Sequence, residues 1–212
     1  MSSLIFHTES KLAVVATDTL AMSLDQNIPY NFMTKAYILP HLRLIVCGTG
    51  LGSFGIQWFT QINENLVVAD IDNLNYHTPD ALNKLWSSFK SAHKEIEKTT
   101  STMYHFGFSE SDECIHSYVY RSTNNFKSEH IVYGLGYKPE CNPPDQYKFP
   151  EDIIKMMEQQ KEIQSTKPIS ERLGIGGEIQ MIVLNENGFN VSIIHKFDDY
   201  DSDKNIIYSK FK

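Results

Sequence analysis

The sequence has 212 residues, 41% of them hydrophobic and 12% aromatic, which is enough for a domain with a buried core and excludes a disordered chain. Its net charge of −7 at pH 7, with 19 Lys and Arg residues scattered along the chain, argues against a nucleic-acid partner, because phosphate binding needs clustered basic side chains. We therefore expect one globular domain spanning residues 1–212.

Cysteines, histidines and apolar runs exclude further classes of protein. Cys47, Cys114 and Cys141 are odd in number and far apart, which argues against a disulfide framework or a zinc site. The histidines form no HxxxH or HExxH motif, and the acidic segment 199–210 lacks the glycine and glutamate of a calcium loop, so no metal or other cofactor is predicted. No signal peptide and no run of roughly 20 apolar residues is found, so we expect a cytoplasmic protein with no membrane partner.

The first half of the chain predicts two β-hairpins followed by two helices. Apolar runs joined by short turns predict strands at 4–6 with 12–17 and at 35–39 with 42–47. Helical spacing of apolar residues predicts a helix at 54–62. A second helix is expected from Pro79 to about Glu97, with Thr78 as its cap and Pro79 in its first turn.

The second half predicts further hairpins and one more helix. Strands are expected near 102–108, 114–121, 130–133, 178–184 and 189–197, a helix at 151–165, a proline-rich loop at 136–150 and a solvated tail at 198–205. Strands joined by short turns pair antiparallel, and two such pairs precede the first helix. The order predicts an α+β fold, a four-layer αββα sandwich of two stacked antiparallel sheets with helices outside.

The stretch IVCGTGLGSFG at 45–55 raises a different possibility. Gly50, Gly52 and Gly55 match the dinucleotide-binding fingerprint, and Asp70 and Asp72 follow roughly where a ribose-binding acid is expected. That site needs two parallel strands joined by a helical crossover, whereas the strand before the glycines already pairs in a hairpin. A sharp turn from a strand into a packed helix is therefore favoured, and a nucleotide-binding enzyme is the weaker alternative.

The N-terminal third carries a more specific pattern. If Met1 is removed, the chain begins SSLIFHTESKLAVVATDTLA, and Asp18 ends the returning strand sixteen positions after Ser2. Lys35 opens the next strand, and Cys47-Gly48-Thr49-Gly50 leads from a strand into the first helix. Together with GLG at 134–136 and GIGGEIQMIVL at 174–184, this order resembles proteasome β-subunits and their simpler bacterial relative HslV, which are N-terminal nucleophile (Ntn) hydrolases.

The resemblance implies a site and a reaction. Ser2 would be the nucleophile, and its own α-amino group, with an ordinary pKa of about 7.7–8.0, would be the base. Lys35 would lower the pKa of that amine, Asp18 would hold Lys35 ionised, and the backbone N–H of Gly48 would face the oxyanion. Glycine at 48 would leave the path of the substrate's carbonyl open. The implied function is hydrolysis of a peptide or small amide by a homo-oligomer.

The sequence departs from that family at supporting positions. Where the family has a serine in the glycine-rich turn and an Asp and a Ser before the final glycines, this chain has Leu135, Arg172 and Ile175. Glu171 and Thr19 are the nearby candidates for a replacement. A catalytically silent relative that acts as a binding or assembly protein is therefore the alternative function. If Lys35 lies in a surface cleft, Lys35→Ala should leave the fold intact.

Overall fold

The computed structural model describes residues 2–23, 28–93, 96 and 99–209, and its strands form two five-stranded antiparallel sheets and a separate hairpin. The β1 sheet has the order β10-β1-β2-β11-β12, and the β6 sheet has the order β5-β6-β7-β8-β9. The strands are β1 (Leu4–Glu9), β2 (Leu12–Asp18), β5 (Ala36–Leu39), β6 (Leu44–Thr49), β7 (Thr102–Phe108), β8 (Ile115–Arg121), β9 (Ser128–His130), β10 (Gly134–Lys138), β11 (Glu178–Asn185) and β12 (Gly188–Lys196), with β3 (Leu20–Met22) and β4 (Pro29–Phe32) in the hairpin.

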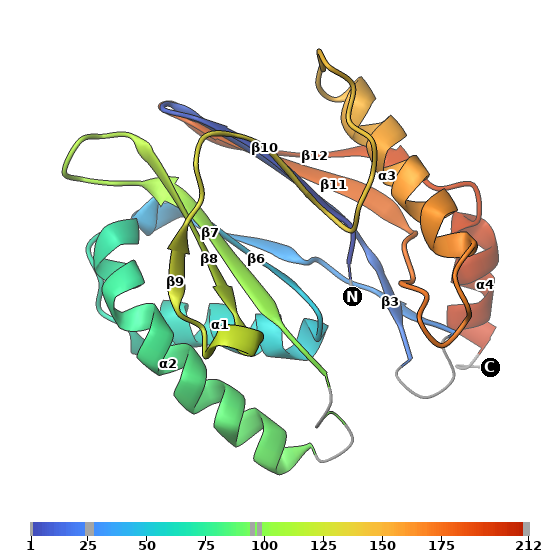
Figure 1. The fold of residues 1–212 in the computed structure, drawn as a ribbon, viewed down its shortest axis with the longest axis horizontal. Helices are drawn as coiled ribbons and strands as arrows, with labels where there is room; N and C mark the ends of the chain where they lie inside the picture. The colour runs from blue at the N-terminus through green and yellow to red at the C-terminus, as the bar shows by residue number, and fades with distance from the viewer. Residues whose placement is uncertain (1, 24–27, 94–95, 97–98, 210–212) are drawn as a thin grey trace.

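Helices cover the outer faces of the two sheets (Figure 1). Helices α1 (Gly52–Asn65) and α2 (Ile71–Ala92) lie on the β6 sheet, α3 (Glu151–Ser165) lies on the β1 sheet, and α4 (Tyr200–Ser209) packs against β4. The predicted four-layer αββα sandwich is confirmed. Within the described ranges, none of the helices is both long and apolar enough to cross a membrane.

Three apolar clusters fill the spaces between the four layers. Leu4 on β1 and Phe106 on β7 belong to the cluster between the two sheets. Ile5 belongs with Met157 of α3 to the cluster on the opposite face of the β1 sheet, as the alternation of side chains along a strand requires. The third cluster surrounds Trp58 and fills the space between the β6 sheet and helices α1 and α2. This alternation decides which face each residue of β1 presents.

Helix α2 begins eight residues earlier than predicted. Asp70 is its cap and accepts a hydrogen bond from the backbone N–H of Asn73 at 2.8 Å. Pro79 lies inside the helix, and the buried hydroxyl of Thr78 donates to the carbonyl of Leu74 at 2.8 Å rather than capping. Proline removes one helical hydrogen bond, and the apolar face that α2 buries on the sheet outweighs that loss. The predicted end of this helix near residue 97 lies outside the described residues.

The segment predicted as a proline-rich loop begins with strand β10, which pairs with β1. Lys138 lies opposite Leu4, and Gly134 lies opposite Thr8. Glycine is required within this pair, because a Cβ at Gly136 would lie 2.1 Å from the ring of Phe6. The loop therefore starts only after β10, and β10 is an edge strand beside the N-terminal strand.

The tail at 198–205 is mostly exposed, as expected, but most of it belongs to helix α4, which was not predicted. Its Tyr200 ring stacks on Phe32 of β4 with centroids 4.9 Å apart, and Ile207 is buried. Neither β3 nor β4 was expected from the sequence. The contact between α4 and β4 explains why neither element was predicted, since two short segments that are polar by composition become ordered by packing on each other.

A polar cluster fixes the first turn of α2 to the β6 sheet. His116 on β8 lies between two carboxylates, with Nδ1 2.8 Å from Asp72 and Nε2 3.2 Å from Asp112. The hydroxyl of Tyr118 donates to Asp72 at 2.6 Å. Burial by itself lowers the pKa of His116, but the hydrogen bonds and charges of the two carboxylates raise it above its ordinary value.

We predict a pH-dependent stabilisation from this cluster. Because the pKa of folded His116 is raised, its contribution is fully present below about pH 6.5, the unfolded value, and is lost as the pH rises through the folded pKa. An NMR titration of the imidazole should give a pKa above 6.5. The His116→Asn variant should lose stability below that pH and differ little from the unaltered protein at pH 9. A His116 pKa at or below 6.5 would contradict this account.

Candidate active site

Asp18 and Lys35 form a buried ion pair where the two sheets meet. Asp18 is the last residue of β2, and Lys35 directly precedes β5. The Lys35 Nζ lies 2.8 Å from Asp18 Oδ1, and the side chains are 6% and 0% exposed. Lys35 also donates to the carbonyl of Leu20 at 2.6 Å. Each buried charge therefore has its partner, and the ammonium group is held in one place.

Two backbone groups complete the surroundings of Asp18. The N–H of Ser3 donates to Oδ1 at 2.9 Å, and the N–H of Gly176 donates to Oδ2 at 3.2 Å. Asp18 thus connects the start of β1, the residue before β5 and the segment before β11. These hydrogen bonds fix the orientation of its carboxylate.

The Lys35 side chain is buried, whereas the sequence analysis expected it to lie in a surface cleft. Desolvation lowers the pKa of Lys35 from its ordinary value, and the nearby charge and hydrogen bond of Asp18 oppose that shift. Removing the lysine would leave the wholly buried carboxylate of Asp18 without its counter-charge. The premise for expecting Lys35→Ala to leave the fold intact is therefore removed, and we expect a loss of about 3–5 kcal/mol instead, because breaking a buried pair costs that much.

The four predicted site residues lie close together in space. Ser2 is only 7% exposed and precedes β1, whose residues alternate between the two faces of the β1 sheet. A small recess brings Ser2 together with residues of β5, β6 and α1, and it is lined by Ser2, Met33, Thr34, Lys35, Tyr37, Gly48, Gly50, Leu51, Gly52 and Gly55. Met1, whose removal the mechanism requires, lies outside the described residues.

Gly48 lies at the end of β6, beside this recess. Its N–H donates to the carbonyl of Lys35 with an N···O distance of 3.4 Å, which is long for a hydrogen bond. A Cβ at Gly48 would lie 2.9 Å from the sulfur of Met103 on β7. A side chain at position 48 would therefore displace the end of the Met103 side chain, so the packing of β7 also favours glycine here.

The positions aligned with the family's supporting side chains lie elsewhere. Leu135 pairs with His7, which is five residues along β1 from Ser2 and hence roughly 17 Å away. Arg172 is exposed and donates to the carbonyl of Ser165 at 2.6 Å, and Ile175 is buried in the apolar cluster beneath α3. These three side chains therefore have structural roles.

Neighbouring groups that the sequence analysis missed support the pair instead. Gly176 uses only its backbone N–H, and Leu20 only its carbonyl, so no side-chain pattern points to either. Thr19, a predicted replacement, accepts a hydrogen bond from the N–H of Glu178 at 2.8 Å and so fixes the start of β11 beside Asp18. Glu171, the other predicted replacement, is exposed.

The strand topology excludes a dinucleotide site at the glycine loop. β6 is antiparallel to both of its neighbours, β5 and β7, and the residues 66–70 form no strand. Asp70 caps α2, and Asp72 binds His116. Gly50, with a φ of +110°, makes the sharp turn toward α1, and Gly52 and Gly55 lie within α1, so the interpretation of these glycines as a dinucleotide-binding fingerprint is wrong.

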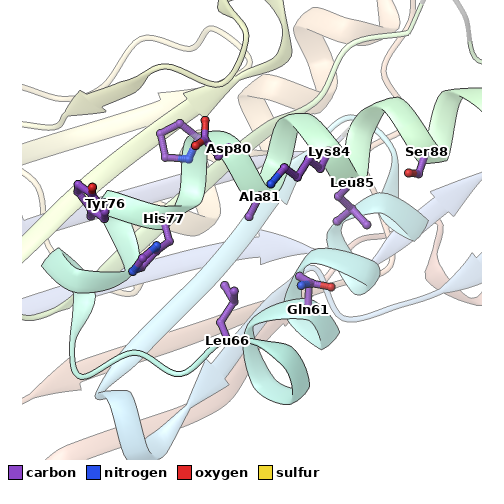
Figure 2. A pocket seen from close by; sticks show the side chains of 10 residues that line it. Gln61, Leu66, Tyr76, His77, Asp80, Ala81, Lys84, Leu85 and Ser88 are labelled. Atoms are coloured by element: carbon purple, nitrogen blue, oxygen red, sulfur yellow. The ribbon is translucent and has the colours of Figure 1, made fainter.

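A larger hollow between α1 and α2 is separate from this recess (Figure 2). It has a volume of about 700 Å3 and shares no lining residue with the recess around Ser2. Gln61 of α1 and Lys84 of α2 lie on opposite sides of it. Its wall combines apolar side chains such as Leu66 and Leu85 with unlike charges on Asp80 and Lys84, which gives no single ligand chemistry.

Comparisons with known proteins identify the fold. Anbu from Hyphomicrobium sp. strain MC1 aligns with 100% of this chain and 94% of its own, with a TM-score of 0.59 and 13% identity. The chain has the fold of Anbu, which is Ntn-hydrolase-like. A Gly-1 mutant of Anbu aligns with 100% of this chain and 96% of its own, with a TM-score of 0.57 and 12% identity. No family model and no curated protein matches the sequence.

These neighbours correct the family resemblance drawn from the sequence. Both of the solved structures described above are of Anbu, and the resemblance to proteasome β-subunits and HslV therefore named the wrong relatives. At 12–13% identity the likeness to Anbu shows the fold alone.

Proposed function

We propose that this protein hydrolyses an amide bond, in a peptide or a small amide, with Ser2 as the nucleophile after removal of Met1. The observation that carries the proposal is the recess in which Ser2 and Gly48 line the same space as Lys35, itself held 2.8 Å from Asp18. A nucleophile, a fixed positive charge and a backbone donor at one place are what acyl transfer requires.

The proposed reaction begins with proton transfer within one residue. The α-amino group of Ser2 accepts the proton of its own hydroxyl as Oγ attacks the carbonyl carbon. The resulting α-ammonium returns that proton to the leaving amine, and an ester to Ser2 remains. Water then attacks the ester, with the same amine as base, and releases the acid.

Lys35 and Asp18 act through charge in this scheme. We treat the pair as ionised, because a neutral Lys35 would leave the buried carboxylate of Asp18 with only backbone donors. The positive charge then lowers the pKa of the nearby α-amino group and keeps it unprotonated at neutral pH. Gly48 would exchange its long bond to Lys35 for the oxyanion of the tetrahedral intermediate.

Met33 limits what the recess accepts. Its side chain packs against Gly52, since a Cβ there would lie 2.8 Å from the sulfur of Met33. We predict that Met33→Ala raises the rate at which acylating probes with bulky side chains label Ser2, by about tenfold, because it removes the obstruction. The rate for a probe with a methyl side chain should stay unchanged. Equal changes for both probes would show that Met33 does not select by size.

A catalytically silent binding or assembly protein is the second candidate. The bond from Gly48 to Lys35 and the packing of Met33 on Gly52 favour it, because both occupy space that a substrate needs. We propose a homo-oligomer in either case. Size-exclusion chromatography with light scattering gives its mass, and a monomer would overturn that part of the proposal.

Labelling separates the two candidates. Protein produced to begin at Ser2 should react with a serine-acylating β-lactone and gain one adduct, which peptide mapping places on Ser2. The Ser2→Ala variant, made in the same way, should gain none. An oligomer that forms normally and never labels would favour the silent protein.

A further inference from the structure

Helix α3 carries a polar residue where its inner face should be apolar. Its buried positions are Ile153, Met156, Met157, Gln160 and Gln164, which recur at helical spacing and face the β1 sheet. Gln160 is 0% exposed. A buried amide costs free energy unless both its donor and its acceptor are bonded, so its partners show what this position provides.

The side-chain amide of Gln160 makes hydrogen bonds through both its oxygen and its nitrogen, to residues next to the ends of two strands beside Ser2. Its Oε1 accepts a hydrogen bond from the hydroxyl of Ser3, and its Nε2 donates to the carbonyl of Pro139 at 2.6 Å. Ser3 follows the proposed nucleophile directly. Pro139 follows β10, whose last residue Lys138 pairs with Leu4. One side chain therefore joins α3 to the two neighbouring strands at the point where the N-terminus emerges.

Ser3 is consequently held from two sides. Its backbone N–H binds Asp18 at 2.9 Å, and its hydroxyl binds Gln160. Side chains alternate along β1, so Ser3 faces α3 as Ile5 does, and Ser2 faces the space between the sheets as Leu4 does. Fixing Ser3 toward α3 therefore directs Ser2 toward Lys35.

We propose that Gln160 is a positioning residue, which holds Ser3 so that the amine and hydroxyl of Ser2 stay beside Lys35. The inference rests on the proposed function and adds to it a residue on the far side of the sheet. It predicts that Gln160 and Ser3 act as one unit. Removing either partner should misplace Ser2 to the same extent, and removing both should add little.

The test compares Gln160→Leu, Ser3→Ala and the double variant, all beginning at Ser2. Met157→Ala is the matched control, because Met157 is equally buried on α3 and belongs to the apolar cluster there. Each single variant should lower the rate of β-lactone labelling by about 10- to 100-fold, since small displacements of reacting groups have effects of this size. The double variant should resemble the singles, and Met157→Ala should label at the unaltered rate despite its lower stability.

A 15N NMR titration of the Ser2 α-amino group tests the inference without catalysis. Because Ser2 moves away from Lys35, the pKa of this amine should rise toward its ordinary value of about 7.7–8.0 in Gln160→Leu and Ser3→Ala, and stay unchanged in Met157→Ala. An unchanged amine pKa in both variants would overturn the inference, whether or not Ser2 labels. Failure of the unaltered protein to label, with the amine pKa shifted as expected, would overturn the hydrolase proposal alone.

Discussion

Replacing Lys35 with Met should strongly slow labelling of Ser2 at neutral pH and lower the free energy of unfolding by about 3–5 kcal/mol. The stability loss follows because Asp18 is 0% exposed and would lose its charged partner, keeping only the N–H groups of Ser3 and Gly176. The slower labelling follows because the α-amino group would no longer lie beside a positive charge, so that its pKa rises and less of it is unprotonated. Urea unfolding and intact mass after β-lactone treatment measure the two effects.

A double-mutant cycle separates the role of Lys35 in stability from its role in the reaction. Asp18→Asn and the double variant Lys35→Met/Asp18→Asn complete the cycle. Because the double variant removes both charges, it should be destabilised by less than the sum of the two single changes. It should still label slowly at neutral pH. Labelling restored together with stability would show that Lys35 only maintains the fold.

Adding one glycine before Ser2 should lower the labelling rate by about 10²–10⁴-fold, which is the usual contribution of a general base. The extra residue converts the amine of Ser2 into a peptide nitrogen, which cannot accept the hydroxyl proton, while the hydroxyl itself remains. Ser2 is only 7% exposed, so the comparison needs proteins produced with each N-terminus from the start. Labelling rates by mass spectrometry, measured from pH 6 to pH 9, give the result.

The pH profile supplies the control for that comparison. In the protein beginning at Ser2 the rate should rise with pH and level off above the pKa of the amine, because only the unprotonated amine accepts a proton. The glycine-extended protein should label slowly, and its rate should not show this rise and plateau with pH. Equal rates and identical profiles in the two proteins would mean that the amine of Ser2 is not the base.

The sequence predicted the architecture because its local signals agree with its long-range contacts. The pairs β1/β2 and β5/β6 are hairpins with short turns, so apolar runs and turn residues suffice to specify them. The interval from Ser2 to Asp18 follows from the first of these hairpins. Asp18 and Lys35 are only 17 residues apart, so their order in the sequence is enough to suggest that they pair.

Contacts between distant segments could not be read in the same way. Leu135 was aligned beside Ser2 by its glycines, but the register of β10 against β1 places it opposite His7. Gln160 lies 157 residues from Ser3, and its place on an otherwise apolar helical face carries no sign of its partner. Gly176 contributes a backbone N–H, which every residue but proline has. Pairing register and backbone donors follow from tertiary packing.

Hydrolysis by Ser2 is best tested by the mass of the protein purified from its own organism and treated with a serine-acylating β-lactone. We expect a chain that begins at Ser2, one methionine short of the full sequence, with a single adduct on the peptide that contains Ser2. A chain that retains Met1 would contradict it, because the proposed base would then be a peptide nitrogen. A chain that begins at Ser2 and carries no adduct there would contradict it equally.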